Sequence, residues 1–109
     1  MILKHLFLAA GLAFLLGGCG VSDRVDPILA LDGNAAAGAA IYSENCSSCH
    51  AGDGSGNSGP DIRGSAADLG DAALVDQILD GSVLMPDFGD DLSDQQVADL
   101  VAWIKQELG

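Results

Sequence analysis

Hydrophobic positions divide the chain into an apolar N-terminal run, a stretch without periodicity and a long part with helical spacing. The run from Leu6 to Leu16 contains no polar residue and has about half of the ~20 apolar residues that a membrane-spanning helix needs. Because this run follows Lys4, it is typical of a secretory signal peptide, which we assign to residues 1–18. Residues 20–32 show no hydrophobic periodicity and are predicted to form a tether.

Three later segments are predicted to be helices. The first covers residues 34–45 with Asn34 as its N-cap, the second covers residues 71–80, and the third begins with a Ser93–Gln96 capping box. Apolar residues recur at helical spacing in the last two segments: Leu74, Ile78 and either Val75 or Leu79, then Val97, Leu100, Val101, Ile104 and Leu108. No strand pattern appears in the sequence, so the domain is predicted to be all-α.

Composition narrows the possible functions. The 109 residues suffice for one small domain, and a formal charge of -12 excludes nucleic-acid binding through phosphate neutralisation. An apolar fraction of 49% excludes a disordered acidic tail. Aromatic residues make up only 5% of the chain, so a core of side chains alone would be thin. A domain of this size often needs disulfides, a metal or a cofactor to stabilise it.

The first of three cysteines ends a lipidation motif. The sequence Leu16-Gly-Gly-Cys19 resembles a bacterial lipobox, which implies cleavage before Cys19 and attachment of lipid to it. The alternative is an uncleaved anchor with a free thiol. We therefore expect an exported protein on the periplasmic face of a membrane, with residues 19–32 as lipidated cysteine and tether and residues 33–109 as the folded domain. Gly20, where Asp would signal retention at the inner membrane, favours the outer membrane.

The other two cysteines belong to Cys46-Ser-Ser-Cys49-His50, the attachment pattern of c-type haem. Two thiols at this spacing add to the two vinyl groups of one porphyrin, and the adjacent histidine binds the iron. A zinc site needs two more ligands, but the chain without its signal offers no other histidine and no other cysteine except Cys19. A thioredoxin-like pair would follow a strand, and a disulfide would leave His50 unexplained. One covalently bound haem c is the prediction.

The second axial ligand is predicted by elimination. Met1 leaves with the signal peptide, so Met85 is the remaining methionine, in an irregular segment before Pro86. A methionine that merely fills a core gap is the alternative, and Lys105 is another candidate ligand, on the last predicted helix. Iron held by histidine and methionine has a raised reduction potential.

These residues together resemble the class I cytochromes c of the small bacterial monohaem type. The resemblance extends from about residue 34 to residue 108. Gly38 and Tyr42 precede Cys46 by eight and four residues, and Trp103 lies in Asp-Leu-Val-Ala-Trp-Ile of the last predicted helix, as in this family. The resemblance implies a cytochrome c fold, with three main helices and loops wrapped around the haem. It also implies that the first and last of these helices cross at Gly38.

The loop Gly-Pro60-Asp-Ile62-Arg63-Gly looks like the family's loop below the haem. The resemblance implies that the carbonyl of Pro60 accepts the N–H of His50 and that Ile62 packs on the porphyrin. An ordinary turn proline is the alternative for Pro60. Arg63 could reach a haem propionate, although a solvated surface arginine is the more frequent case.

The predicted function is electron transfer by a membrane-tethered one-electron carrier, not enzymatic catalysis. It would exchange electrons with a redox donor and acceptor, as a monomer or as a subunit of a membrane complex. Its acidic charge favours partners with a basic or an apolar docking site. Two other functions stay open: a haem-based sensor or ligand-binding domain, and the electron-entry subunit of a larger membrane oxidoreductase.

Overall fold

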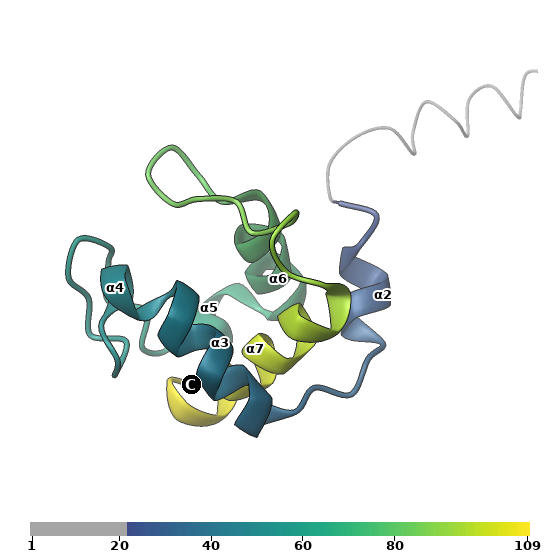
Figure 1. Cartoon of the computed structure of the whole chain (residues 1–109), viewed down its shortest axis with the longest axis horizontal. Coiled ribbons are helices and arrows are strands. Elements are labelled where there is room, and N and C mark those ends of the chain that lie inside the picture. Colours follow the sequence, from purple (N-terminus) through teal and green to yellow (C-terminus); the bar gives the residue numbers. More distant parts are fainter. Residues whose placement is uncertain (1–21) are drawn as a thin grey trace, which may run out of the picture.

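The computed structural model describes residues 22–109. The predicted signal peptide and Cys19 lie outside this range. The helices within it are α2 (Val25–Leu29), α3 (Ala35–Asn45), α4 (Ser47–His50), α5 (Ser65–Leu69), α6 (Asp71–Asp80) and α7 (Asp94–Glu107), as Figure 1 shows. No strand occurs among these residues, which confirms the all-α prediction.

Side-chain caps explain why two long helices begin where the sequence predicts. The side chain of Asn34 accepts a hydrogen bond from the backbone N–H of Ala37 at 3.1 Å, at the start of α3. At the start of α7, the Ser93 hydroxyl accepts from the backbone of Gln96 at 3.1 Å, and the Gln96 side chain accepts from the backbone of Ser93 at 2.9 Å. These reciprocal bonds satisfy backbone donors that have no partner within the helix.

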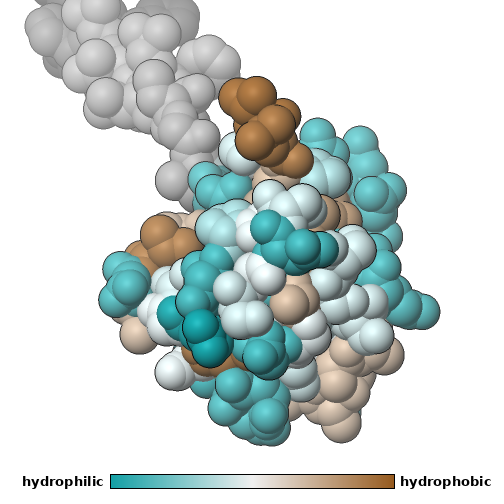
Figure 2. All heavy atoms as spheres, turned by 90° about the vertical axis from the view of Figure 1, so that its left-hand side faces the viewer, coloured by the Kyte–Doolittle hydropathy of each residue, from teal (hydrophilic) through white to brown (hydrophobic). Residues whose placement is uncertain are grey.

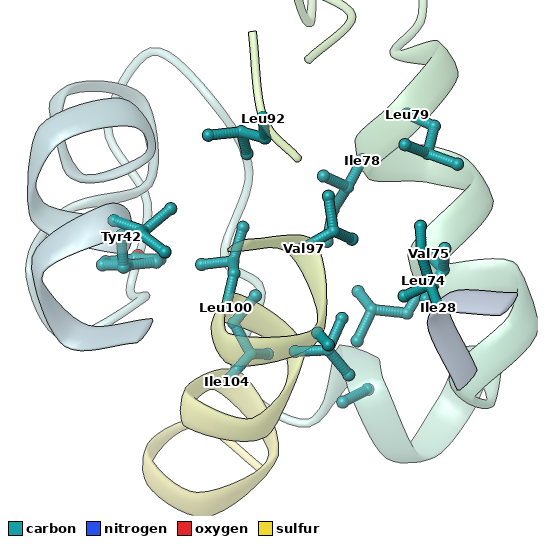
Figure 3. Packing of buried hydrophobic residues seen from close by; sticks show 14 of the residues in the cluster. Ile28, Tyr42, Leu74, Val75, Ile78, Leu79, Leu92, Val97, Leu100 and Ile104 are labelled. Carbon is teal, nitrogen blue, oxygen red and sulfur yellow. The ribbon is translucent and has the colours of Figure 1, made fainter. Parts of the chain in front are cut away.

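The core lies between α7, α6 and α2 on one side and between α7 and α3 on the other (Figure 3). On α6, Val75 and Leu79 are both buried together with the other two predicted apolar residues, so the apolar face is wider than predicted. The five predicted apolar residues of the last helix are all buried. The helical spacing therefore placed the core residues of both helices correctly.

Helices α3 and α7 cross at Gly38. A Cβ atom on Gly38 would lie 2.8 Å from the Cβ of Trp103 and still closer to the backbone carbonyl of Asp99, so only glycine allows this approach. The rings of Tyr42 and Trp103 stack beside the crossing with centroids 4.4 Å apart. The crossing implied by the family resemblance is confirmed.

The segment before α3 differs from the sequence-based expectation. Residues 20–32 are predicted to be a tether, but α2 lies within them, and its Val25 and Ile28 are each only 2% exposed. These two residues stand three positions apart and pack against the core. A five-residue helix is too short to produce a recognisable hydrophobic period. The prediction of a free tether is therefore wrong from Val25 onward.

None of the helices in the described part of the chain combines the length and hydrophobicity that crossing a membrane requires.

Candidate haem site

The two cysteines and the histidine of the motif lie on a single helical turn. Helix α3 ends at Asn45, and the backbone N–H of His50 donates to the carbonyl of Cys46 at 3.0 Å. Because residues at i, i+3 and i+4 share one face of a helix, this turn directs Cys46, Cys49 and His50 to the same side. Cys46 is half-buried, Cys49 is exposed, and both are free thiols.

The surroundings of Cys46 bear on the zinc alternative through the pKa of its thiol and through the number of possible ligands nearby. Burial, and to a smaller extent the neighbouring Cys49, raise the pKa of the Cys46 thiol to about 11. Within residues 22–109, no group of three or more His, Cys, Asp or Glu side chains is placed to hold a metal ion. The zinc alternative therefore finds no support in the described structure.

The ring of His50 is oriented by the loop that follows it. The Nδ1 atom of His50 lies 2.9 Å from the carbonyl oxygen of Pro60, and because a carbonyl only accepts, Nδ1 must carry the proton. Nε2 then keeps its lone pair, the state in which imidazole binds iron. A Cβ on Gly59 would lie 2.9 Å from Cε1 of His50, so glycine is needed beside the ring. His50 itself is 9% exposed.

Two further contacts hold the loop around His50. The hydroxyl of Tyr42 donates to the carbonyl of Ala51 at 2.6 Å, and Ala51 has a left-handed φ of 67°. Ile62, which is half-buried, packs against the core, and its backbone N–H donates to the carbonyl of Gly54 at 2.8 Å. Tyr42 of α3 thus fixes Ala51, the residue after His50. Contacts with the core fix Ile62, two residues after Pro60.

Arg63 is exposed and engaged with a near neighbour. Its guanidinium lies 2.7 Å from the carboxylate of Asp61, and hydrogen bonds from Arg63 lower the pKa of Asp61 to about 2. This geometry matches a solvated surface arginine, as expected.

Met85 comes from a different part of the chain, the loop between α6 and α7. Its carbonyl accepts from the backbone N–H of Ser82 at 2.9 Å, which closes a tight turn. Its Sδ accepts a hydrogen bond at 3.4 Å from Nε2 of Gln77, a residue of α6. A Cβ on Gly81, where φ is 64°, would collide with the carbonyls of Met85 and Pro86. Figure 1 shows this loop and α4 on the same side of the molecule.

Comparisons with known proteins decide the family. Residues 33–104 match the family model described as cytochrome C oxidase, cbb3-type, subunit III. A cytochrome c-553-like protein from Synechocystis sp. is 33% identical over 82 residues, which cover 74% of this chain and 76% of that protein. The chain belongs to this family of cytochromes c.

Solved structures agree with this assignment. Cytochrome cL from Hyphomicrobium denitrificans superposes with a TM-score of 0.59 at 32% identity over 65% of this chain. The chain spans only 45% of the length of that protein. Cytochrome cL from Methylophaga aminisulfidivorans superposes with a TM-score of 0.64 at 20% identity. The matched part covers 80% of this chain and 69% of that protein, and it supports the cytochrome c fold.

Membership of the family makes the chain a small monohaem c-type cytochrome, an electron-transfer protein rather than an enzyme, with covalently bound haem c and redox partners. The described residues fit such a cofactor, because two free thiols and an imidazole with a free Nε2 lie on one turn. The fold prediction, the prediction of the cofactor and the recognition of the family are confirmed.

Sequence reasoning missed two residues near the site, Gln77 and Gly59. Gln77 donates to Met85, yet it is a polar, exposed residue in a helix, which no pattern distinguishes from its neighbours. Gly59 contacts the ring of His50, and its position directly before Pro60 was the available signal for a close approach of backbone to ring.

Proposed function

We propose that the chain is a membrane-tethered carrier of single electrons in which His50 and Met85 hold the haem iron. Bound haem supplies a one-electron Fe(III)/Fe(II) couple. The observation that carries the proposal is the contact between Nδ1 of His50 and the carbonyl of Pro60. It fixes the ring and its tautomer, so that Nε2 is the atom available to the iron.

Each further residue of the site has a distinct role in the proposal. The thiols of Cys46 and Cys49 form thioethers, in which each S–H adds across a vinyl group and the haem becomes part of the chain. Pro60 orients the imidazole. Ile62 supplies an apolar wall, since it is half-buried against the core.

Met85 is the second axial ligand in this proposal. Its Sδ has two lone pairs, and Gln77 donates to the sulfur from α6 at 3.4 Å. One lone pair would remain for the iron. Iron held by Nε2 of His50 and Sδ of Met85 would offer no position to a substrate, and its reduction potential would be raised. This ligand set suits a carrier better than a sensor, which needs a vacant or labile position.

The tether is the second part of the proposal. Cleavage after residue 18 would leave Cys19 as the lipidated N-terminus of an exported protein. Each buried CH₂ of an acyl chain contributes roughly 0.8 kcal/mol, and more than one chain gives stable anchoring. The domain would then work at the periplasmic face of a membrane, with the outer membrane favoured by Gly20.

We place the docking surface for redox partners at residues 83–86 and at the Cys46–Cys49 edge. Val83 and Leu84 are 99% and 93% exposed, more than any other large apolar side chain of the described residues. Figure 2 shows the face that carries the Met85 loop, with a hydrophobic projection above a mostly hydrophilic and neutral surface. A small apolar contact of this kind fits the short-lived encounters of electron carriers.

A second function is favoured by the description of the matched family, which names a subunit of a cytochrome c oxidase. The chain could be the electron-entry subunit of a larger membrane oxidoreductase. A subunit would copurify with that enzyme after mild detergent extraction, whereas a free carrier would be recovered alone.

The first test is production of the full chain in a host with working haem maturation. We expect a coloured protein with the mass of one covalently attached haem, and a pyridine haemochrome spectrum of the c type. Replacing both thiols, in Cys46→Ala/Cys49→Ala, should abolish covalent attachment. Recovery of Cys19 with lipid by mass spectrometry tests the tether. A colourless product would contradict the proposed site.

The second test addresses the axial methionine. Met85→Ala should remove the weak long-wavelength absorption band of methionine-ligated ferric haem. It should also lower the midpoint potential by on the order of 0.1–0.3 V, within the ~0.8 V range that axial ligands set. Asp87→Ala, an exposed change in the same loop, is the matched control and should keep both properties. If the band survives in Met85→Ala, Met85 is not the ligand.

A further inference from the structure

Arg24 reaches from the N-terminal segment to the loop that carries Met85. It precedes α2 and lies outside the region matched by the family model, which starts at residue 33. Its Nε lies 2.7 Å from Oδ1 of Asp94, and its Nη2 donates to the carbonyl of Leu92 at 2.9 Å. Its Nη1 donates to the carbonyl of Gly89. All three guanidinium nitrogens are therefore engaged with residues 89–94.

Two of these contacts, with the carbonyls of Gly89 and Leu92, fall on the returning arm of the loop, residues 86–93, and the third falls on Asp94, the first residue of α7. The opposite side of this arm is bound to α6, because the backbone N–H groups of Phe88 and Gly89 donate to the carbonyls of Ile78 and Leu79 at 3.0 and 3.2 Å. Two N–H groups of the arm thus pair with α6, while the carbonyls of Gly89 and Leu92 pair with Arg24. Gly89 is only four residues from Met85, so the arm is fixed close to the proposed ligand.

Arg24 is itself held in place by the helix that follows it. Val25 and Ile28 of α2 are buried in the core, which fixes the backbone from which the side chain extends. The arginine side chain is 34% exposed, so its contacts are partly shielded from water. A planar guanidinium with five donors binds two carbonyls and a carboxylate at once, which a lysine ammonium on a flexible stem does less well.

We propose that Arg24 is a positioning residue for Met85: by bracing the returning arm of the loop, it keeps the thioether sulfur on the iron. This inference rests on the proposed ligation by His50 and Met85. The N-terminal segment would then have two roles. It connects the domain to the proposed lipid anchor, and it restrains the loop that carries Met85.

The physical link is an equilibrium between a closed and an open loop. An added ligand such as imidazole binds the ferric iron only when the sulfur has left. Its apparent dissociation constant is therefore the intrinsic constant divided by the fraction of open protein. Removing the contacts of Arg24 from the closed loop raises the fraction of open protein and therefore lowers the apparent dissociation constant of imidazole.

The experiment compares Arg24→Gln with Lys105→Gln in the haem-loaded full chain. Lys105 supplies the control for the loss of one cation, because its hydrogen bond goes to Asp71 of α6 at 2.9 Å, so its ammonium is engaged there and not with the loop that carries Met85. We expect Arg24→Gln to tighten imidazole binding by about tenfold, the effect of losing charge-assisted hydrogen bonds from the closed state. Lys105→Gln should bind imidazole as the unaltered protein does. Arg24→Lys should lie between the two.

A separate readout distinguishes positioning from a general loss of stability. Heating should abolish the long-wavelength band of Arg24→Gln at a lower temperature than in the unaltered protein, with a smaller change in the temperature at which helical circular dichroism is lost. Equal imidazole affinities for Arg24→Gln and Lys105→Gln would overturn the role of Arg24 and leave the ligation intact. Absence of the band from the unaltered protein would overturn the methionine ligation itself.

Discussion

Among single side chains, Tyr42 joins the core to the site most directly. Its ring stacks on Trp103, and its hydroxyl holds the carbonyl of Ala51 at 2.6 Å. A non-glycine residue with a φ of 67°, such as Ala51, needs support from its surroundings. Tyr42 therefore supports the residue that directly follows the proposed axial histidine, from a helix whose own position is fixed by the crossing with α7.

We expect Tyr42→Phe to lower the free energy of unfolding by about 1 kcal/mol at neutral pH, the usual contribution of one hydrogen bond. Burial, which is the largest cause, raises the pKa of Tyr42 above its ordinary value of 10.0. The folded state thus holds the phenolic proton more tightly, and this stabilisation is present below pH 10.0 and is lost as the pH rises through the raised pKa. Denaturant unfolding of both proteins across this range should show the difference shrinking.

The cysteine and histidine residues of the motif could be predicted, because their spacing alone matches the attachment pattern of c-type haem. Cys46, Cys49 and His50 need no tertiary information, and Pro60 follows from the family's loop. Gln77 and Arg24 could not be predicted, since each acts on a partner at least eight positions away in the sequence. A polar residue that bonds to a distant segment leaves no local pattern.

Among the helices, the crossing of α3 and α7 has the least tolerance for change. The close approach at Gly38 involves the backbone carbonyl of Asp99, which cannot rotate away as a side chain would. An added methyl group must therefore push the helices apart, together with the stacked aromatic rings. Because α3 ends at the cysteine motif, a displaced crossing would also displace the site.

Gly38→Ala should destabilise the domain by about 2–3 kcal/mol, as overpacking in a tight core does, and lower Tm by roughly 10–20 °C. Gly52→Ala is the matched control, since a Cβ at Gly52 would meet no atom within 4 Å. Thermal unfolding followed by circular dichroism measures both. An equal Tm for the two variants would show that the crossing relaxes without cost.

The long helices were predictable and the short ones were not, for a physical reason. The N-cap Asn34 and the Ser93–Gln96 capping box indicate in the sequence where α3 and α7 begin. About three turns of apolar spacing are enough to recognise a helix. Helices α2, α4 and α5 have only four or five residues, about one turn, and depend on their surroundings for stability.

In the molecule as a whole, negative charge predominates. Residues 22–109 contain all 16 acidic residues of the chain but only three arginines and lysines. Each of these cations is paired with a carboxylate: Arg24 with Asp94, Arg63 with Asp61 and Lys105 with Asp71. The described surface therefore offers no unpaired arginine or lysine to an acidic partner, and long-range attraction favours cationic ones.

Electron exchange with small complexes of opposite charge tests this directly. Oxidation of the reduced protein by a cationic ruthenium ammine should slow as salt is added, by on the order of tenfold between low and physiological ionic strength. Oxidation by anionic hexacyanoferrate should accelerate over the same range. Stopped-flow rates measure both, and a salt dependence of the opposite sign would mean that the electron leaves through a locally positive region.

The docking of α2 onto the core has a consequence for how far the carrier travels. A free linker over residues 20–32 would allow a radius of ~40 Å, but with the chain fixed from Arg24 onward only about five residues remain, or roughly 18 Å. For a lipid at Cys19, the volume searched by the domain shrinks by about tenfold, and the effective concentration of membrane-bound partners rises accordingly. If the proposed lipid anchors Cys19, such a carrier would exchange electrons with neighbours on the same bilayer.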